Sequence, residues 1–131
     1  MATTQPSVET RLASRAEFDA RVAKAKARWD DLWNGSKTVY TVGIGSCSIA
    51  KGAVRLLAEL ESHFSGVDDT VVRKTSCNGA CWMEPWVEVK RPGAPPIIYQ
   101  QVDATEVQDL LEGRLDDRIV GVRADEDFGD I

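Results

Sequence analysis

The residues of this chain whose type and spacing suit chemistry are its three cysteines, Cys47, Cys77 and Cys81. Soft thiolates that gather at one point suit an iron–sulfur cluster, a zinc ion or Cu(I). An odd number of cysteines excludes a framework in which every cysteine is paired in a disulfide. The cysteines therefore indicate metal binding or redox chemistry, whereas the plain alternative for any one of them is a small buried apolar residue.

Two predicted strands must position these cysteines. Residues 37–42 and 70–74 are rich in β-branched side chains, which is typical of strands. Between them, apolar residues over 49–64 recur at helical spacing, so a single helix is expected to join the strands. Strands joined in this way lie parallel with a right-handed crossover, and their carboxyl ends share one edge of the sheet. Because one cysteine follows the first strand and two follow the second, we expect the three thiols to converge.

The rest of the pattern completes a small α/β domain. Residues 86–90 and 97–100 are expected to form a hairpin around a turn rich in Pro and Gly. A last helix over 107–111 is expected to end at Gly113. The predicted fold is thioredoxin-like, with a four-stranded mixed sheet flanked by helices and an extra N-terminal helix.

The extra helix is predicted over 14–33, where Ser14 and Glu17 match a capping box. We expect residues 1–36 to form an N-terminal extension with this amphipathic helix. Residues 37–115 would then form the thioredoxin-like domain, and residues 116–131 an acidic C-terminal tail.

The composition limits the partners that we expect. A length of 131 residues suits one domain with short extensions, and a net charge of −5 argues against a nucleic-acid partner. No apolar run approaches the roughly 20 residues of a membrane span. The first fifteen residues carry no apolar signal region, so we expect a cytoplasmic location, where thiols stay reduced.

Three segments resemble a known family. The Gly-rich turn and helix start at 43–53, the Cys-x3-Cys-x2-Glu-Pro segment at 77–89 and residues 98–102 are similar to the thioredoxin-like 2Fe-2S ferredoxin domain. That domain occurs in the small subunit of NADH dehydrogenases of the complex I type. It also occurs at the start of the NADH-binding subunit of soluble hydrogenases and formate dehydrogenases. The similarity covers about residues 38–113.

The resemblance implies a 2Fe-2S cluster with Cys47, Cys77 and Cys81 as metal ligands. It implies an electron-transfer subunit or domain of an NADH-linked flavin and iron–sulfur oxidoreductase, rather than a stand-alone enzyme. The implied partner is a flavin- and NADH-binding subunit or another iron–sulfur subunit of the complex. No residue in the sequence suggests a general acid, base or nucleophile for substrate chemistry.

One departure from the family leaves a ligand open. The family's usual pattern has four cysteines, the first pair spaced Cys-x4-Cys, and this spacing places Val42 at the first ligand position. The fourth ligand is then Ser46, Ser48 or Thr41, or it comes from a partner subunit. The alternative is a clusterless module that retains the fold and docks subunits.

Three other functions were weighed against the cluster. A Cys3His zinc site would need His63, but the intervening helix places it roughly 24 Å from Cys47 at about 1.5 Å per residue. A thiol–disulfide enzyme would need two cysteines at the start of the helix, where only one stands. A dinucleotide-binding turn would need a third glycine where Ser48 stands.

Other residues near the cysteines have plain interpretations. Lys51 is expected on the solvated helix face rather than on a phosphate. The Glu84–Pro85 peptide bond is expected to be trans, as most X-Pro bonds are. Trp82 and Trp86 are expected to shield a cluster, to face a partner or to fill the core.

Overall fold

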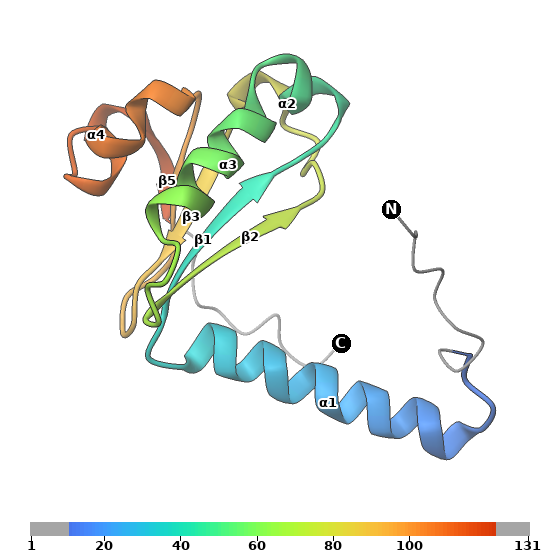
Figure 1. Cartoon of the computed structure of the whole chain (residues 1–131). Coiled ribbons are helices and arrows are strands. Elements are labelled where there is room, and N and C mark those ends of the chain that lie inside the picture. Colours follow the sequence, from blue (N-terminus) through green and yellow to red (C-terminus); the bar gives the residue numbers. More distant parts are fainter. Residues whose placement is uncertain (1–10, 123–131) are drawn as a thin grey trace.

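A five-stranded mixed sheet organises residues 11–122, the part of the chain that this computed structural model describes (Figure 1). The strand order is β2-β1-β3-β4-β5. Strand β1 pairs parallel with β2, and the other neighbouring pairs are antiparallel. The strands are β1 Thr38–Gly43, β2 Thr70–Thr75, β3 Val87–Lys90, β4 Ile97–Tyr99 and β5 Ile119–Val122.

The first two strands confirm the predicted parallel pair. Their register runs from Thr38 opposite Thr70 to Gly43 opposite Thr75, so both strands end at the same sheet edge. The bond from the Ile44 N–H to the Thr75 carbonyl, 2.8 Å long, extends the pairing beyond the last register pair. The predicted hairpin is confirmed by the antiparallel pairing of β3 with β4.

The sheet has one strand more than the predicted four. Residues 116–118 form a 3-10 turn, and Ile119–Val122 pairs with β4 as the edge strand β5. The sequence instead predicts an acidic tail here, because a four-residue strand beside several acids gives little periodic signal. The rest of the predicted tail, 123–131, and residues 1–10 of the predicted extension lie outside the described residues.

The single helix predicted between β1 and β2 is two helices, α2 (Ser46–Ala50) and α3 (Ala53–His63). The break falls at Gly52, whose φ of 95° lies in the left-handed region that glycine adopts without a steric penalty. The last helix, α4 (Val107–Leu111), ends as predicted near Gly113, which also has a positive φ of 71°.

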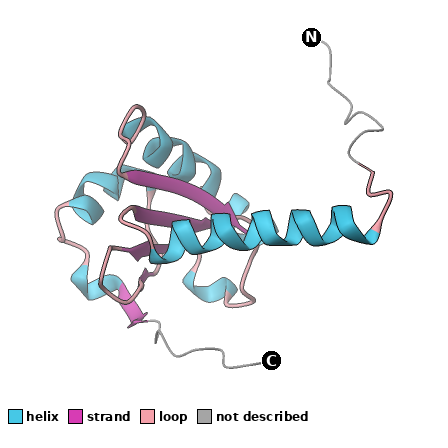
Figure 2. Ribbon diagram, turned by 90° about the horizontal axis from the view of Figure 1, so that it is seen from below, coloured by secondary structure: helices cyan, strands magenta, loops and turns pink. Residues whose placement is uncertain are grey.

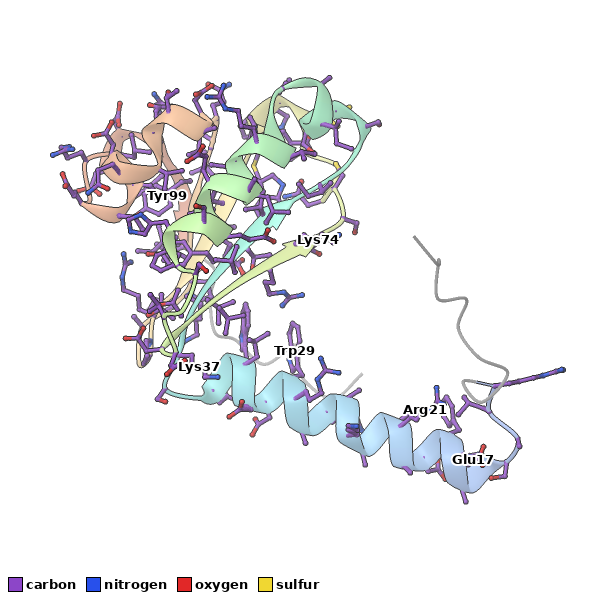
Figure 3. The ribbon with its side chains drawn as sticks, in the orientation of Figure 1. Glu17, Arg21, Trp29, Lys37, Lys74 and Tyr99 are labelled. Atoms are coloured by element: carbon purple, nitrogen blue, oxygen red, sulfur yellow. The ribbon has the colours of Figure 1, made fainter. Side chains whose placement is uncertain are left out.

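Helices α3 and α4 cover one face of the sheet and enclose the core (Figure 1). Tyr40 of β1 stacks on Phe64 after α3, with ring centroids 4.9 Å apart. Tyr99 of β4 lies near α3 and α4 in Figure 3 and is buried. The buried core residues come from β1, β3, β4, α3, α4 and the segments that follow β4 and α4: Tyr40, Val42, Leu56, Leu60, Val87, Val89, Tyr99, Val102, Val107, Leu110 and Leu115.

Helix α1 (Arg15–Asn34) confirms the predicted N-terminal helix and extends beyond the sheet (Figures 1 and 2). Ser14 caps it by accepting the Glu17 N–H at 3.2 Å. The Glu17 carboxylate accepts the N–H of Ala13, one residue earlier than a capping box requires. No residue of α1 is buried. Within 11–122, no helix has both the length and the apolar character needed to cross a lipid bilayer.

Candidate metal centre

The three cysteines meet at the edge of the sheet where β1 and β2 end. Cys47 lies in the first turn of α2, Cys77 in the loop after β2, and Cys81 at the start of a 3-10 turn, Cys81–Met83. The Sγ atoms of Cys77 and Cys81 are 3.9 Å apart, and those of Cys47 and Cys81 lie within 4.8 Å. The structure thus brings together the three thiols that the sequence analysis singled out, with Cys81 between the other two.

The thiols of the site share hydrogen bonds. The hydrogen bond of Cys81 with Cys47, followed by that with Cys77 and by desolvation, raises the pKa of Cys81 to about 11. The raised pKa favours the protonated thiol. A bound metal ion favours the thiolate instead, because a coordinating thiol is deprotonated outright. Metal uptake at this site must therefore release protons.

A tight turn aims a backbone N–H group at one of the sulfurs. The Asn78 side chain accepts the Ala80 N–H at 2.9 Å, and Gly79 between them has a φ of 87°. The Gly79 N–H donates to Cys77 Sγ at 3.3 Å. Hydrogen bonds of this kind stabilise a thiolate, and they tune the potential of a cluster bound to it.

The Gly-rich turn after β1 allows the second cysteine segment to approach closely. A Cβ atom added at Gly45 would lie 3.0 Å from Cys77 Cβ. A Cβ atom added at Gly43 would lie 2.4 Å from Nε1 of Trp86, a buried side chain. Both glycines are needed for packing because any larger residue would push the turn away from Cys77 or Trp86.

The second cysteine segment is also fixed from its other side. Gln101 donates its backbone N–H to the Met83 carbonyl at 2.9 Å and its side-chain amide to the Trp82 carbonyl at 3.2 Å. The N–H of Val102 donates to the Pro85 carbonyl at 2.9 Å. The Glu84–Pro85 peptide bond is cis, so the expectation of a trans bond is wrong.

Lys51 bonds to the cysteine segment, although the sequence analysis expected it on the solvated helix face. Its ammonium group donates to the Cys81 carbonyl at 2.8 Å, while the residue as a whole stays exposed. The contact joins residues thirty positions apart, which local periodicity does not reveal. Lys51 therefore places a positive charge on the backbone of the cysteine segment, at the Cys81 carbonyl.

Glu84 also lies near the thiols. The sequence alone did not predict it as a metal ligand. Its side chain is only 1% exposed. One carboxylate oxygen forms a group with the sulfurs of Cys47 and Cys81, all within 4.8 Å of one another. Neither oxygen has a hydrogen-bond partner among the described residues. The one available signal was an acidic residue three positions after Cys81.

The positions considered for a fourth ligand differ in their surroundings. Val42 lies in the apolar core and is fully buried. Ser48 is fully buried as well, and its hydroxyl accepts the Gly45 N–H at 2.7 Å and donates to the Gly45 carbonyl at 3.0 Å. Ser46 is exposed, and Thr41 is buried in β1.

Trp82, Trp86 and His63, the other residues considered near the site, differ in how exposed they are to solvent. Trp82 is 65% exposed, next to Cys81, whereas Trp86 is buried. His63 is exposed at the last position of α3, and the cluster of possible ligands in residues 11–122 does not include it. A Cys3His site thus finds no support in the geometry.

Comparisons with known proteins agree with this fold. No family model matches the chain. The NADP-reducing hydrogenase subunit HndB of Solidesulfovibrio fructosivorans is 29% identical over 77 residues, which are 57% of this chain and 61% of that subunit. The chain therefore spans about three fifths of the length of the curated relative that it matches.

Two structures of a thioredoxin-like 2Fe-2S ferredoxin from Aquifex aeolicus are also similar. Their TM-scores are 0.54 and 0.56, and their sequence identities with this chain are 18% and 17%. The matches cover 66% and 68% of this chain and 98% and 94% of the ferredoxin. These likenesses confirm the thioredoxin-like fold, and together with the curated relative they support the resemblance that the sequence motifs predicted.

Proposed function

We propose that this chain holds a 2Fe-2S cluster on Cys47, Cys77 and Cys81 and passes single electrons within a larger oxidoreductase complex. The observation that carries the proposal is the convergence of three thiols on one sheet edge. The relative HndB is a subunit of an NADP-reducing hydrogenase, and the structural neighbours are 2Fe-2S ferredoxins. Both support an electron-transfer subunit.

The spacing of the thiols fits a metal site. Two thiolates on one tetrahedral metal, at about 2.3 Å from it, lie roughly 3.8 Å apart. The 3.9 Å between the sulfurs of Cys77 and Cys81 matches this separation. The cluster would supply one-electron redox chemistry when bound. The chain would supply three thiolates, the Gly79 N–H at the Cys77 sulfur and the Lys51 ammonium at the Cys81 backbone carbonyl.

The edge of the site suits exchange of electrons with a partner. Cys47 is exposed, and the Trp82 ring stands in solvent beside Cys81. We propose a flavin- and NADH-binding subunit or another iron–sulfur subunit as the partner that covers this edge. The cytoplasmic location predicted from the sequence stays a prediction.

The second candidate is a clusterless docking module. Val42, which replaces a ligand of the family pattern, favours it, because this position is part of the apolar core. Helix α1 also favours docking, since the part of the chain that the structure describes, residues 11–122, buries no residue of this helix. The two functions differ in metal content.

Anaerobic reconstitution with iron and sulfide separates the two functions. We expect about two irons per chain, visible charge-transfer absorption and an EPR signal on reduction. The Cys77→Ser variant should lose most of the iron, while Ser76→Ala, at the exposed neighbouring position, should keep it. A colourless parent chain would contradict the proposal, and one tight zinc per chain would favour a zinc site instead.

A further inference from the structure

The proposed function leaves one ligand position unfilled. A 2Fe-2S cluster takes four protein ligands, two on each iron, and this chain has three cysteines. The sulfurs of Cys77 and Cys81 are close enough to share one iron, as argued above. Cys47 would then bind the other iron, which needs one more donor from the chain or from a partner.

Glu84 is the polar side chain that points at this gap. Its carboxylate oxygen lies within 4.8 Å of the sulfurs of both Cys47 and Cys81. The residue directly follows the 3-10 turn that begins at Cys81, and its N–H bonds to the Cys81 carbonyl at 3.4 Å. The same backbone segment therefore positions the thiol and the carboxylate.

The buried carboxylate of Glu84 lacks a hydrogen-bond partner among the described residues. The side chain is 1% exposed, and neither oxygen accepts a hydrogen bond from any residue in 11–122. Transfer of a carboxyl group from water into the protein without a partner opposes folding strongly. Lys51, the nearby cation, donates to the Cys81 carbonyl instead. A metal ion beside the thiols would satisfy the carboxylate.

The chemistry of the donor is also suitable. Carboxylates bind iron in non-haem sites alongside other protein ligands. An ionised carboxylate carries the same charge as the thiolate that the family pattern places at the fourth position. Two other positions fit less well, because the Ser48 hydroxyl is already bonded to Gly45 and Val42 has no donor atom.

We propose that the Glu84 carboxylate is the fourth protein ligand of the cluster and shares one iron with Cys47, while Cys77 and Cys81 hold the other. This inference rests on the proposed function. It assigns the chain an asymmetric site with three sulfur donors and one oxygen donor, complete without a ligand from a partner subunit.

Four variants test this assignment by metal content and spectra rather than by activity. Glu84→Gln preserves the shape of the side chain but removes the anionic donor, and Glu84→Leu removes both oxygens. Glu84→Cys replaces the carboxylate with a fourth thiolate. Glu88→Gln is the matched control, because Glu88 is also buried and lies four positions further along, in β3. Each chain is reconstituted anaerobically with iron and sulfide alone.

We expect Glu84→Gln and Glu84→Leu to lower iron affinity by at least the roughly 10-fold that loss of an outer-shell partner causes. Glu84→Cys should keep about two irons, with visible and EPR spectra shifted from those of the parent. Glu88→Gln should match the parent. In the iron-free state, Glu84→Leu should melt at a higher temperature than the parent, because it removes a buried group without a partner.

The outcomes separate this inference from the proposed function. If Glu84→Leu takes up as much iron as the parent and gives the same spectra, Glu84 is not a ligand, although the cluster stands. A lower melting temperature of iron-free Glu84→Leu, with iron uptake unchanged, would assign Glu84 a structural role instead. If the parent chain takes up no iron, the proposed function fails and the Glu84 assignment fails with it.

Discussion

The cysteine end of the sheet and helix α1 differ in how far the chain covers their side chains. At the cysteine end, Ser48, Glu84 and Trp86 are buried. No residue of α1 is buried, and the Trp29 ring is 48% exposed. The difference indicates that residues 11–122 organise the cysteine end by themselves, whereas α1 presents a surface that these described residues leave uncovered.

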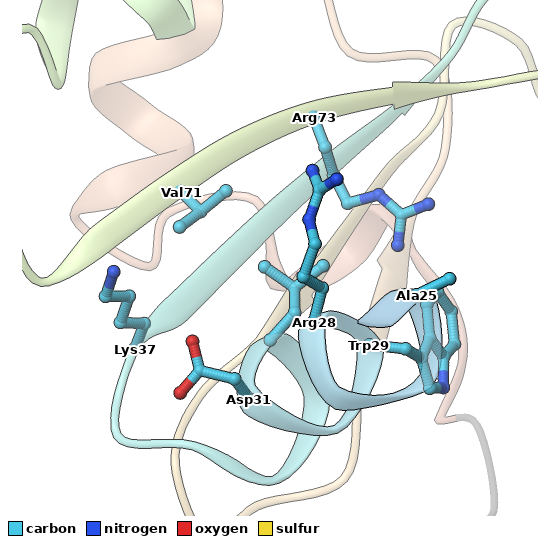
Figure 4. A pocket seen from close by; sticks show the side chains of 8 residues that line it. Ala25, Arg28, Trp29, Asp31, Lys37, Val71 and Arg73 are labelled. Carbon is cyan, nitrogen blue, oxygen red and sulfur yellow. The ribbon is translucent and has the colours of Figure 1, made fainter. Parts of the chain in front are cut away.

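The contact between α1 and the sheet is correspondingly loose. Trp29 stacks on Trp33 with ring centroids 5.2 Å apart, and the Arg73 guanidinium of β2 lies 5.3 Å from the Trp29 ring. In Figure 3 the Trp29 side chain rises from α1 toward the sheet. Figure 4 shows the open pocket between them, where Arg28 and Asp31 of α1 face Lys37 and β2. Stacking and cation–π attraction, rather than core burial, hold this end.

The largest expected effect is a contrast in stability between the two regions. Leu56→Ala removes a fully buried side chain of α3 from the core of the sheet domain and should lower the free energy of unfolding by about 2–5 kcal/mol. Trp29→Ala removes an exposed ring from α1 and should lower it by about 1 kcal/mol or less. Urea denaturation measures both, and equal losses would show that α1 is as much a part of the folded core as α3.

The second effect tests whether the thiols are organised before metal binds. The raised pKa of Cys81 means that the folded metal-free chain holds this proton more tightly than the unfolded chain. The stabilisation is therefore complete below the unfolded-state pKa of about 8.5 and is lost as the pH rises through about 11. Melting temperatures of the metal-free chain from pH 8 to 11 measure this loss.

The control for this measurement is Cys81→Ser, which removes the titrating thiol. Burial also raises the pKa of Tyr40, whose titration destabilises both chains at high pH. Only the difference between the parent and Cys81→Ser therefore reports on Cys81. Parallel pH profiles of the two chains would show that the thiols are not in contact before metal binds.

The smallest expected effect concerns the charge on Lys51. Its ammonium group bonds to the Cys81 carbonyl at the surface and should favour the reduced, more negative state of a cluster. Interactions of exposed charges are worth about 0.2–1 kcal/mol, or roughly 10–40 mV for one electron. We expect Lys51→Met to lower the midpoint potential by that amount in a redox titration. Lys26→Met, on α1, should leave the potential unchanged.

Much of the scaffold follows from local pattern. The parallel pairing of β1 with β2, the β3–β4 hairpin and α1 rest on strong periodicity and a capping residue, and the structure confirms them. The break at Gly52 was missed because the apolar spacing continues across it, and β5 was missed because it is short. Edge strands and helix breaks depend on tertiary context that a periodic pattern does not contain.

The candidate site was predictable only in part, because some of its contacts follow from the strand topology and others depend on tertiary context. Convergence of the thiols follows from topology, since one parallel pair brings the strand ends together. The roles of Lys51 and Glu84 depend on contacts across the fold. Lys51 reaches a carbonyl thirty residues away, and Gln101, just after β4, anchors the segment that carries Glu84. No local pattern reports such contacts.

Mössbauer spectroscopy of the iron-reconstituted chain distinguishes iron bound only by sulfur from iron that also binds oxygen. We expect two oxidised iron sites of equal intensity with different parameters, one with Cys77 and Cys81 and the other with Cys47 and Glu84. In Glu84→Cys the two sites should become alike. A chain without iron would exclude the cluster, and a parent chain whose two irons are equivalent would exclude Glu84 as a ligand.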